Sequence, residues 1–536
     1  MSKEPVLLVQ DLRFQYRTRP DPAVEAISFE LRPGEILLVA GASGCGKTTL
    51  ARCVNGLIPR SYKGELRGRI EVCGEETTTW PLARISQKVG TVLQDPERQI
   101  LGTKVLLEVA FGLENLTLPR EEIVARAEEA LGYLRISHLR DRETFHLSGG
   151  EKQKVAVAGV LAMRPTVLLL DEPLASLDPV SAVETLGMVR RLADEGMAVL
   201  LVEHRVEDVL KIHPDRVLFM AEGRIRYLGA LEGLLSVVSH REIKLPAEMV
   251  MRKAAAAPPE PVRERPAPRR SSAGPVVRFE HVTFGYERGP DILKDVSVDI
   301  HPGDVVGVLG PNGAGKTTLV KHAIGLLKPN SGRVLVDGLD TRQASVAQLA
   351  AVVGYVFQSP SHMLFAPSVA EELAFGPKNL GHPAAQIEKE VSEALEIVHL
   401  LDRRSDSPLA LSFGQQKRVS IAAILAMQSR VLVMDEPTAG QDYENYMDFM
   451  DAILQMPAFE AVVFITHDVD LAVSYANRVL LMADGQVRAD GPPHEVLRDL
   501  TLLEACRLVP TSLLQENLKR VHRTGRFLRA EALAHA

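Results

Sequence analysis

The sequence lacks paired cysteines, long apolar runs and an excess of positive charge. Its four cysteines form no C-x-x-C pair, so reduced thiols are expected in place of disulfides, as in a cytosolic protein. No stretch reaches the roughly 18 to 20 apolar residues that span a bilayer, and no apolar signal region stands near the first residue. Any role at a membrane is therefore expected to run through partner chains. A net charge of -7 argues against a protein held on nucleic acid by bulk electrostatics.

The most informative feature that is present is a glycine-rich loop ending in lysine and threonine, which occurs twice. The loops are GASGCGKT at 41–48 and GPNGAGKT at 310–317, and each follows an apolar run typical of a strand. In such a loop the backbone N–H groups converge on phosphate oxygens, the lysine adds a positive charge and the threonine hydroxyl can bind Mg²⁺. Two phosphate-binding loops predict two nucleotide sites.

Other landmarks repeat at nearly the same offset, which makes the chain a tandem duplication. The period is far longer than that of a solenoid, so each copy is expected to be a whole domain. Helical spacing is found at 119–140 and 383–403, and again at Leu514, Leu518 and Val521. Between the copies, seven prolines favour a semi-extended linker. We predict four parts: a domain at 1–245, the linker at 246–275, a second domain at 276–500 and a helical tail at 501–536.

Two short apolar runs, at 167–170 and 431–434, are expected to be strands buried on both faces of a parallel sheet. They are followed by Asp171-Glu172 and Asp435-Glu436, so each carboxylate pair is expected at the edge of the sheet beside a phosphate loop. The aspartate suits a water bound to Mg²⁺, and the glutamate suits a hydrolytic water. The alternative is that each pair only ends a strand and caps a helix.

The stretches LSGGEKQ at 147–153 and LSFGQQK at 411–417 each precede a helical pattern. A serine and a glycine at a helix start offer a hydroxyl and free N–H groups at the positive end of the helix dipole, although a plain helix cap is the alternative. Together with the loops and carboxylate pairs, these stretches resemble the signatures of the ATP-binding cassette (ABC) family over most of the chain. The resemblance implies an α/β fold of two tandem P-loop NTPase ABC nucleotide-binding domains, each with a RecA-like core, a β-rich subdomain and a helical subdomain.

The resemblance also implies ATP and Mg²⁺ as cofactors, with each ATP held between the phosphate loop of one domain and the signature of the other. The residues it assigns to catalysis are Glu172, Glu436, His204, His467, Gln94 and Gln358, with the histidines reaching the γ-phosphate. Those it assigns to the metal are Thr48, Gln94, Asp171, Thr317, Gln358 and Asp435. Those it assigns to ATP are Tyr16, Gly41, Ser43, Gly44, Gly46, Lys47, Thr48, Thr49, Ser148, Gly149, Gly150, Tyr286, Gly310, Asn312, Gly313, Gly315, Lys316, Thr317, Thr318, Ser412 and Gly414.

Two of these assignments have alternatives. Tyr16 and Tyr286 are expected to stack on adenine, but an aromatic residue in a β-rich region is often part of the core. In the second signature, Phe413 stands where the family has its first glycine. A side chain there narrows the backbone freedom that glycine allows, so the site that uses Ser412 and Gly414 is either impaired or, as we favour, still competent.

Segments near the two glutamines are similar to those of energy-coupling factor (ECF) transporter ATPases. They are QDPERQIL at 94–101 and EVAFGLEN at 108–115, with fainter counterparts at 358–365 and 371–376. In that family two ATPases bind an integral membrane T component, which works with a substrate-binding S component to import a vitamin or a transition-metal ion.

The two halves differ in these segments. The resemblance implies that Glu97 meets arginine on the T component, whereas the second half has Ser361 at the matching position. Met363 likewise replaces the glutamine that Gln99 preserves. Docking around Glu97 and Ser361 is therefore expected to depend more on the first half, and a local turn without a partner is the alternative.

The leading hypothesis is an ATPase that drives a membrane importer from the cytoplasmic face as a peripheral subunit. A soluble tandem ABC protein that acts on ribosomes is one alternative, but such proteins join their cassettes by a long charged helical arm, which the Pro/Ala-rich linker does not resemble. The fused ATPase of a sugar-type importer is a closer alternative. The cargo is not predictable from this chain, because a membrane component selects it.

Overall fold

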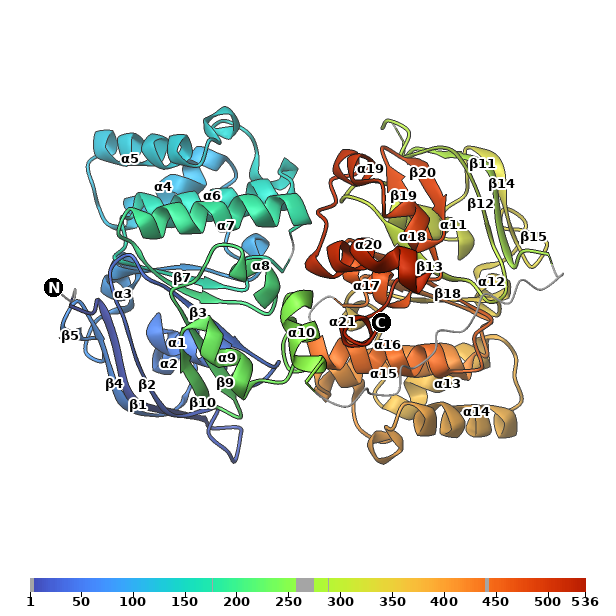
Figure 1. Ribbon diagram of the computed structural model, residues 1–536, viewed down its shortest axis with the longest axis horizontal. Coiled ribbons are helices and arrows are strands. Elements are labelled where there is room, and N and C mark those ends of the chain that lie inside the picture. Colours follow the sequence, from blue (N-terminus) through green and yellow to red (C-terminus); the bar gives the residue numbers. More distant parts are fainter. Residues whose placement is uncertain (1–3, 176, 257–273, 288, 439–442) are drawn as a thin grey trace. The chain divides into compact units, whose positions relative to one another are not determined.

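The computed structural model describes residues 4–536 except 176, 257–273, 288 and 439–442. The chain forms two units, one mainly from residues up to 245 and the other mainly from residue 246 onward (Figure 1). All four cysteines are free. Among the helices of the described residues, none combines the length and the apolar content needed to cross a membrane.

The first unit begins with a four-stranded antiparallel sheet in the order β2-β1-β4-β5. Buried and exposed side chains alternate along much of β2, which is typical of a sheet with one face on the core. The strands are β1 (Leu7–Tyr16), β2 (Val24–Leu31), β4 (Gly64–Val72) and β5 (Glu75–Glu76).

A six-stranded sheet in the order β10-β9-β3-β8-β7-β6 forms the centre of the first unit. All pairings are parallel except that of β9 with β10. Every residue of β3, β7 and β8 is buried, so the prediction of a strand buried on both faces at 167–170 is confirmed. The strands are β3 (Ile36–Gly41), β6 (Val89–Val92), β7 (Val167–Asp171), β8 (Ala198–Val202), β9 (Arg216–Ala221) and β10 (Arg224–Gly229).

Helices of the first unit pack on the central sheet or form a separate group. Helices α4, α5 and α6 contact one another, and Figure 1 shows them at the end of the unit away from β1, β2 and β4. Helix α5 ends earlier than expected, because Arg135 takes a left-handed backbone conformation with φ 57°. The helices are α1 (Lys47–Val54), α2 (Leu57–Arg60), α3 (Leu82–Lys88), α4 (Val105–Asn115), α5 (Arg120–Tyr133), α6 (Gly149–Ala162), α7 (Pro179–Asp194), α8 (Val206–Leu210) and α9 (Leu231–Val237).

The second unit repeats this plan, with sheets in the orders β12-β11-β14-β15 and β16-β17-β18-β13-β19-β20. Its strands are β11 (Val277–Phe284), β12 (Leu293–Ile300), β13 (Val305–Leu309), β14 (Ser331–Val336), β15 (Leu339–Asp340), β16 (Val353–Val356), β17 (Val431–Asp435), β18 (Ala461–Thr466), β19 (Arg478–Ala483) and β20 (Gln486–Gly491). Its helices are α10 (Ala247–Ala254), α11 (Lys316–Ala323), α12 (Val346–Ala350), α13 (Val369–Asn379), α14 (Ala384–Ile397), α15 (Phe413–Ala426), α16 (Tyr443–Gln455), α17 (Val469–Tyr475), α18 (Pro493–Val496), α19 (Leu500–Ala505), α20 (Ser512–Thr524) and α21 (Ala530–Leu533).

The range predicted to be a linker begins with a helix. Helix α10 packs on α20 and α21, and the N–H of Ala247 donates to the hydroxyl of Ser512 over 2.7 Å. The expected semi-extended course is therefore wrong for these residues, since alanine, glutamate, methionine, arginine and lysine are strong helix formers. The rest of the predicted linker lies almost wholly in 257–273, outside the described residues. The four domain limits stay predictions.

Candidate functional site

The phosphate loop and the predicted catalytic residues of the first unit lie where four neighbouring parallel strands end. Strand β3 leads into the phosphate loop, β8 is followed within two residues by His204, β7 ends at Asp171, and β6 is followed by Gln94. Because parallel strands end at the same edge of a sheet, the order β3-β8-β7-β6 brings these residues together. The second unit repeats the arrangement with β13, β18, β17 and β16.

Each phosphate loop turns back sharply on its own lysine. The Nζ atom of Lys47 donates to the carbonyl oxygens of Gly41 and Ala42 over 2.8 Å. Gly41 has φ 150°, and a Cβ atom there would lie 2.2 Å from the carbonyl oxygen of Met220, so only glycine fits the turn. In the second loop Lys316 binds the carbonyl of Gly310 over 2.7 Å in the same way. These tight turns fit the close approach of a phosphate to the backbone.

Both predicted catalytic glutamates have a left-handed backbone, with φ 50° at Glu172 and φ 45° at Glu436. This conformation is uncommon for residues other than glycine and costs of order 1 to 3 kcal/mol. Neighbouring strands hold it, since the N–H of Glu172 donates to Val202 and that of Glu436 to Ile465, each over 2.9 Å. The same uncommon conformation at the matching position of both units supports a shared role for the two residues.

The carboxylate of Glu172 brings together three predicted catalytic residues of the first unit. It accepts from Nε2 of Gln94 over 2.6 Å and pairs with Nε2 of His204 over 2.6 Å. Burial opposes ionisation of Glu172, but the hydrogen bond and charge of His204 outweigh it, so the pKa of Glu172 is lowered. The carboxylate is therefore held ionised, as a group that orients water requires.

The second unit binds its glutamate differently. Nδ1 of His467 pairs with Glu436 over 3.0 Å, and the hydroxyl of Thr466 donates to the same carboxylate over 3.2 Å. Gln358 lies exposed after β16. The two units thus share the glutamate and the histidine, but the imidazole faces the carboxylate through a different nitrogen.

The aspartate of each unit has the oxygen donors that Mg²⁺ prefers. Oδ1 of Asp171 is buried and has no hydrogen-bond partner among the described residues. Burial, reinforced by the charge of Glu172, raises the pKa of Asp171 to about 6. A cation would relieve both effects, so this residue fits a metal ligand.

In the second unit, Oδ2 of Asp435 accepts from the hydroxyls of Thr317 over 3.0 Å and Tyr355 over 2.8 Å. Burial and Asp435 raise the pKa of Tyr355, which keeps its phenol a proton donor to the carboxylate. The sequence reasoning missed Tyr355. The signal for it is its place on β16 shortly before Gln358.

We expect Asp171→Asn to stabilise the protein when Mg²⁺ and nucleotide are absent. Folding raises the pKa of Asp171 above the ordinary value of 3.8, so the ionised carboxyl destabilises the native state above pH 6, and this cost vanishes as the pH falls below about 4. A rise of the pKa from 3.8 to about 6 corresponds to a gain of about 1 to 3 kcal/mol in the stability of the variant at pH 7.5. Urea unfolding at pH 7.5 and pH 5 measures it: the gain should shrink at pH 5. A variant no more stable than the wild type at pH 7.5 contradicts the prediction.

The two signature stretches begin their helices with the same geometry. Ser148 caps α6 with φ −66° and ψ 162°, and Ser412 caps α15 with φ −63° and ψ 157°. Both form a capping box, with Glu151 and Gln415 respectively. Phe413 is the first residue of α15, a helical position that any L-residue adopts. The expected loss of backbone freedom at Phe413 therefore does not distort this helix start.

The predicted adenine-stacking tyrosines lie on or just after the first strand of each antiparallel sheet. The hydroxyl of Tyr16 lies 3.2 Å from that of Thr49, and its ring meets Phe14 edge to face. Tyr286 packs on Phe284 in the same way and is exposed. The remaining loop residues are placed as follows: Ser43, Gly44, Asn312 and Gly313 are exposed; Gly46, Thr48, Thr317 and Thr318 are half-buried; Thr49 and Gly315 are buried. Gly149 and Gly150 open α6, and Gly414 lies in the first turn of α15.

Comparisons with known proteins match this chain to one family. The family model described as ABC transporter matches residues 24–175 and 293–439. A protein of Methanosarcina mazei named "Putative ABC transporter ATP-binding protein" is 37% identical over 94% of this chain and 91% of its own length. A protein of the same name from Enterococcus faecalis is 36% identical over 95% of each chain. The structure of CbiO1 from Clostridium perfringens, described as part of the ABC transporter complex cbiONQ, is 32% identical, with a TM-score of 0.40 over 49% of this chain and all of its own.

The family model matches both halves, and the relatives match nearly the whole length of the chain. These matches account for the duplicated loops and for the duplicated sheet edges. A tandem pair of ATP-binding domains is thus the organisation of the whole chain. The chain belongs to the ABC transporter family, as an ATP-binding protein whose ATPase activity is coupled to transport.

Proposed function

We propose that the chain is the energy-coupling ATPase of an ECF-type importer for a vitamin or a transition-metal ion. In this proposal each ATP, with Mg²⁺, is bound by the phosphate loop of one cassette and the signature of the other. The observation that carries the importer assignment is the segment after each glutamine. In the first unit it comprises the 3₁₀ turn Pro96–Arg98 and helix α4, and in the second Pro360–His362 and α13.

The contacts in each unit support the following chemistry. Glu172 and Glu436 orient and activate the attacking water, and His204 and His467, hydrogen-bonded to these carboxylates, turn to the γ-phosphate when nucleotide is bound. Lys47 and Lys316 leave the loop carbonyls for phosphate oxygens. Mg²⁺, held through Asp171 or Asp435 with a loop threonine and the glutamine, would neutralise phosphate charge.

The proposed docking segments have large apolar side chains that are exposed to solvent. Leu101, Leu107 and Phe111 are exposed in the first unit, and Phe365 and Phe375 are exposed in the second, where their rings meet edge to face at 4.8 Å. Exposed clusters of large apolar residues are typical of surfaces that bind a partner. An amphipathic helix of a membrane protein suits such a surface when its apolar side faces the exposed apolar residues.

Each docking segment also contacts the signature helix of its own unit. Glu97, whose side chain is largely exposed, forms an ion pair with Lys152, which lies on α6 four residues after Ser148. In the second unit the matching residues are Ser361 and Gln416, so both charges are replaced together. A partner that bound the segment would thus act directly on the signature helix.

The two alternatives are less well supported. The fused ATPase of a sugar-type importer shares the cassettes but is not expected to have the glutamine segment at 94–101. A ribosome-acting protein is expected to join its cassettes by a long charged helix, and the part of the join that is described holds only the eight-residue α10.

Co-purification from membranes tests the proposal. The tagged full chain, expressed with its neighbouring genes and extracted in detergent, should retain a polytopic membrane protein and a small substrate-binding membrane protein. Recovery of ribosomes in its place would refute transport, and recovery of a sugar-importer permease would refute the ECF assignment.

Reversing one charge tests where docking occurs. We expect Glu97→Lys to reduce the recovered membrane partner by at least about tenfold, as for a close charge pair at an interface, whereas Ser361→Lys should reduce it far less. The ratio of partner to ATPase in the purified complex measures both. Equal losses for the two variants would contradict docking that depends more on the first half.

A further inference from the structure

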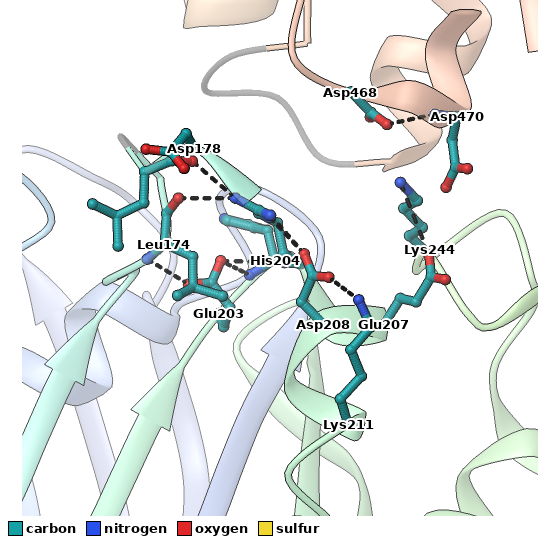
Figure 2. Close-up of polar contacts among 12 residues, drawn as sticks. Leu174, Asp178, Glu203, His204, Glu207, Asp208, Lys211, Lys244, Asp468 and Asp470 are labelled. Carbon is teal, nitrogen blue, oxygen red and sulfur yellow. Dashed lines mark hydrogen bonds and ion pairs between the residues drawn. The ribbon is translucent and has the colours of Figure 1, made fainter. Parts of the chain in front are cut away.

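Two side chains that flank His204 bind both main-chain groups of Leu174, two residues after the proposed catalytic Glu172. Oε2 of Glu203 accepts from the N–H of Leu174 over 3.2 Å, and Nη1 of Arg205 donates to the carbonyl of Leu174 over 3.1 Å. Leu174 is fully buried, and Figure 2 shows its main-chain N–H facing the side chain of Glu203. We call this arrangement the Leu174 clamp.

Glu203 is a buried residue, only 1% exposed. Its other oxygen, Oε1, accepts from the N–H groups of His204 over 3.0 Å and Arg205 over 3.2 Å. Main-chain donors therefore occupy both oxygens, which offsets the cost of burying the group. The same carboxylate thus fixes the backbone of the histidine segment and that of the segment after Glu172.

The Arg205 side of the clamp is oriented by further contacts. Its Nε donates to Asp208 over 2.8 Å, and Asp208 also accepts from Lys211 over 2.7 Å (Figure 2). Nη1 of Arg205 additionally reaches the carbonyl of Leu177 over 3.4 Å. A guanidinium held in this way presents its donors in a fixed direction.

The second unit has different residues at the matching positions, Thr466 and Asp468. The Thr466 hydroxyl donates directly to Glu436 and accepts from the N–H of Asp468 over 3.0 Å. The residue before the histidine therefore contacts the catalytic carboxylate itself in one unit and the backbone beyond it in the other.

We propose that Glu203 and Arg205 are positioning residues for hydrolysis in the first unit. They hold the segment that follows Glu172 in register with His204, so that the carboxylate and the imidazole keep the short contact between them. Neither side chain touches nucleotide in this role. The inference rests on the proposed catalytic roles of Glu172 and His204.

The test compares Glu203→Gln, Arg205→Ala and the double variant in the full-length chain. Glu203→Gln keeps the shape of the side chain but replaces one acceptor oxygen by an NH₂ group, and Arg205→Ala removes the donor to Leu174. We expect each to lower kcat for ATP hydrolysis about tenfold, with KM for ATP within about twofold, as for partners that orient reacting groups. The double variant should lose no more than the worse single variant, because both disrupt one network.

Two controls separate positioning from damage to the fold. Glu390 is another buried carboxylate, 4% exposed, and its partners His382 and Gln386 belong to the helical part of the second unit. Glu390→Gln should keep kcat within about twofold, a difference small on the scale of a lost catalytic contact. Amide hydrogen exchange at Leu174 should become faster in Glu203→Gln but not in Glu390→Gln.

Unchanged kcat in both clamp variants overturns the inference, and so does a rise in KM without a fall in kcat. It is also overturned if the losses of kcat add up in the double variant, or if Glu390→Gln loses as much kcat as the clamp variants. If Glu203→Gln does not fold, Arg205→Ala decides alone, since the arginine side chain is partly exposed. Glu172→Gln in the same assay distinguishes a failure of the proposed catalytic role from a failure of the clamp. Turnover retained in Glu172→Gln refutes the proposed catalysis, whereas turnover lost there but retained in the clamp variants refutes only the clamp.

Discussion

The double variant Glu172→Gln, Glu436→Gln is expected to bind ATP as the wild type does and to hydrolyse it at least about 100-fold more slowly. Both glutamates directly follow a buried strand and have the same left-handed backbone. The amide keeps the size of the side chain but is not a base, so it cannot take a proton from water. Phosphate contacts come from the loop and its lysine and are untouched.

Phosphate release and equilibrium ATP binding measure this prediction in parallel. The matched control is Glu108→Gln, which removes a carboxylate that binds the N–H groups of Leu101 and Gly102 away from the sheet edge. Its folding and ATP affinity, compared with those of the double variant, report the effect of neutralising a buried glutamate. Phosphate release retained by the double variant would refute the catalytic role of the two glutamates. Loss of ATP binding would instead mean that they contribute to the affinity for nucleotide.

Features carried by contiguous residues were predictable from the sequence. The phosphate loops, the carboxylate pairs and the capped signature helices each occupy a few consecutive positions, so pattern and strand burial were enough to find them. The resemblance to the ABC family also assigned Gln94, Glu172 and His204 to one site, and the structure brings these three side chains into contact.

Two contacts of residues that no motif includes were not predicted. Tyr355 binds Asp435 across 80 positions, and Glu203 binds Leu174 across 29. Nothing in the local sequence of either residue indicates its partner. The left-handed backbone of Glu172 was equally hidden, because glutamate has no preference for it and the neighbouring strand imposes it.

The prediction of a semi-extended linker failed for a different reason. Composition averaged over thirty residues concealed a short helical segment at its start. Prolines cluster in its later part, whereas Ala247–Ala254 contains none and has a strongly helical composition. The window average therefore favoured an extended chain where the first residues form α10. A shorter window would have separated the two.

The single variants Glu172→Gln and Glu436→Gln are expected to lose activity to a similar extent, each by at least about tenfold and within about threefold of one another. One residue favours asymmetry, because Phe413 replaces a glycine in the signature that the family resemblance pairs with the first phosphate loop. The helix start at Ser412 nevertheless has the same cap as that at Ser148, so its N–H groups point as they do in the other signature.

Phe413→Gly isolates the contribution of the ring. Because Phe413 is partly exposed and begins a regular helix, its removal should change kcat by less than about twofold. Steady-state ATP hydrolysis checks both statements. The three single variants are measured as full-length chains that are purified in the same way. A much larger loss in Glu436→Gln than in Glu172→Gln, together with a gain in Phe413→Gly, would mean that the ring impairs the first site despite the intact cap. The obstruction would then act on the nucleotide directly, since the backbone of the signature is already in place.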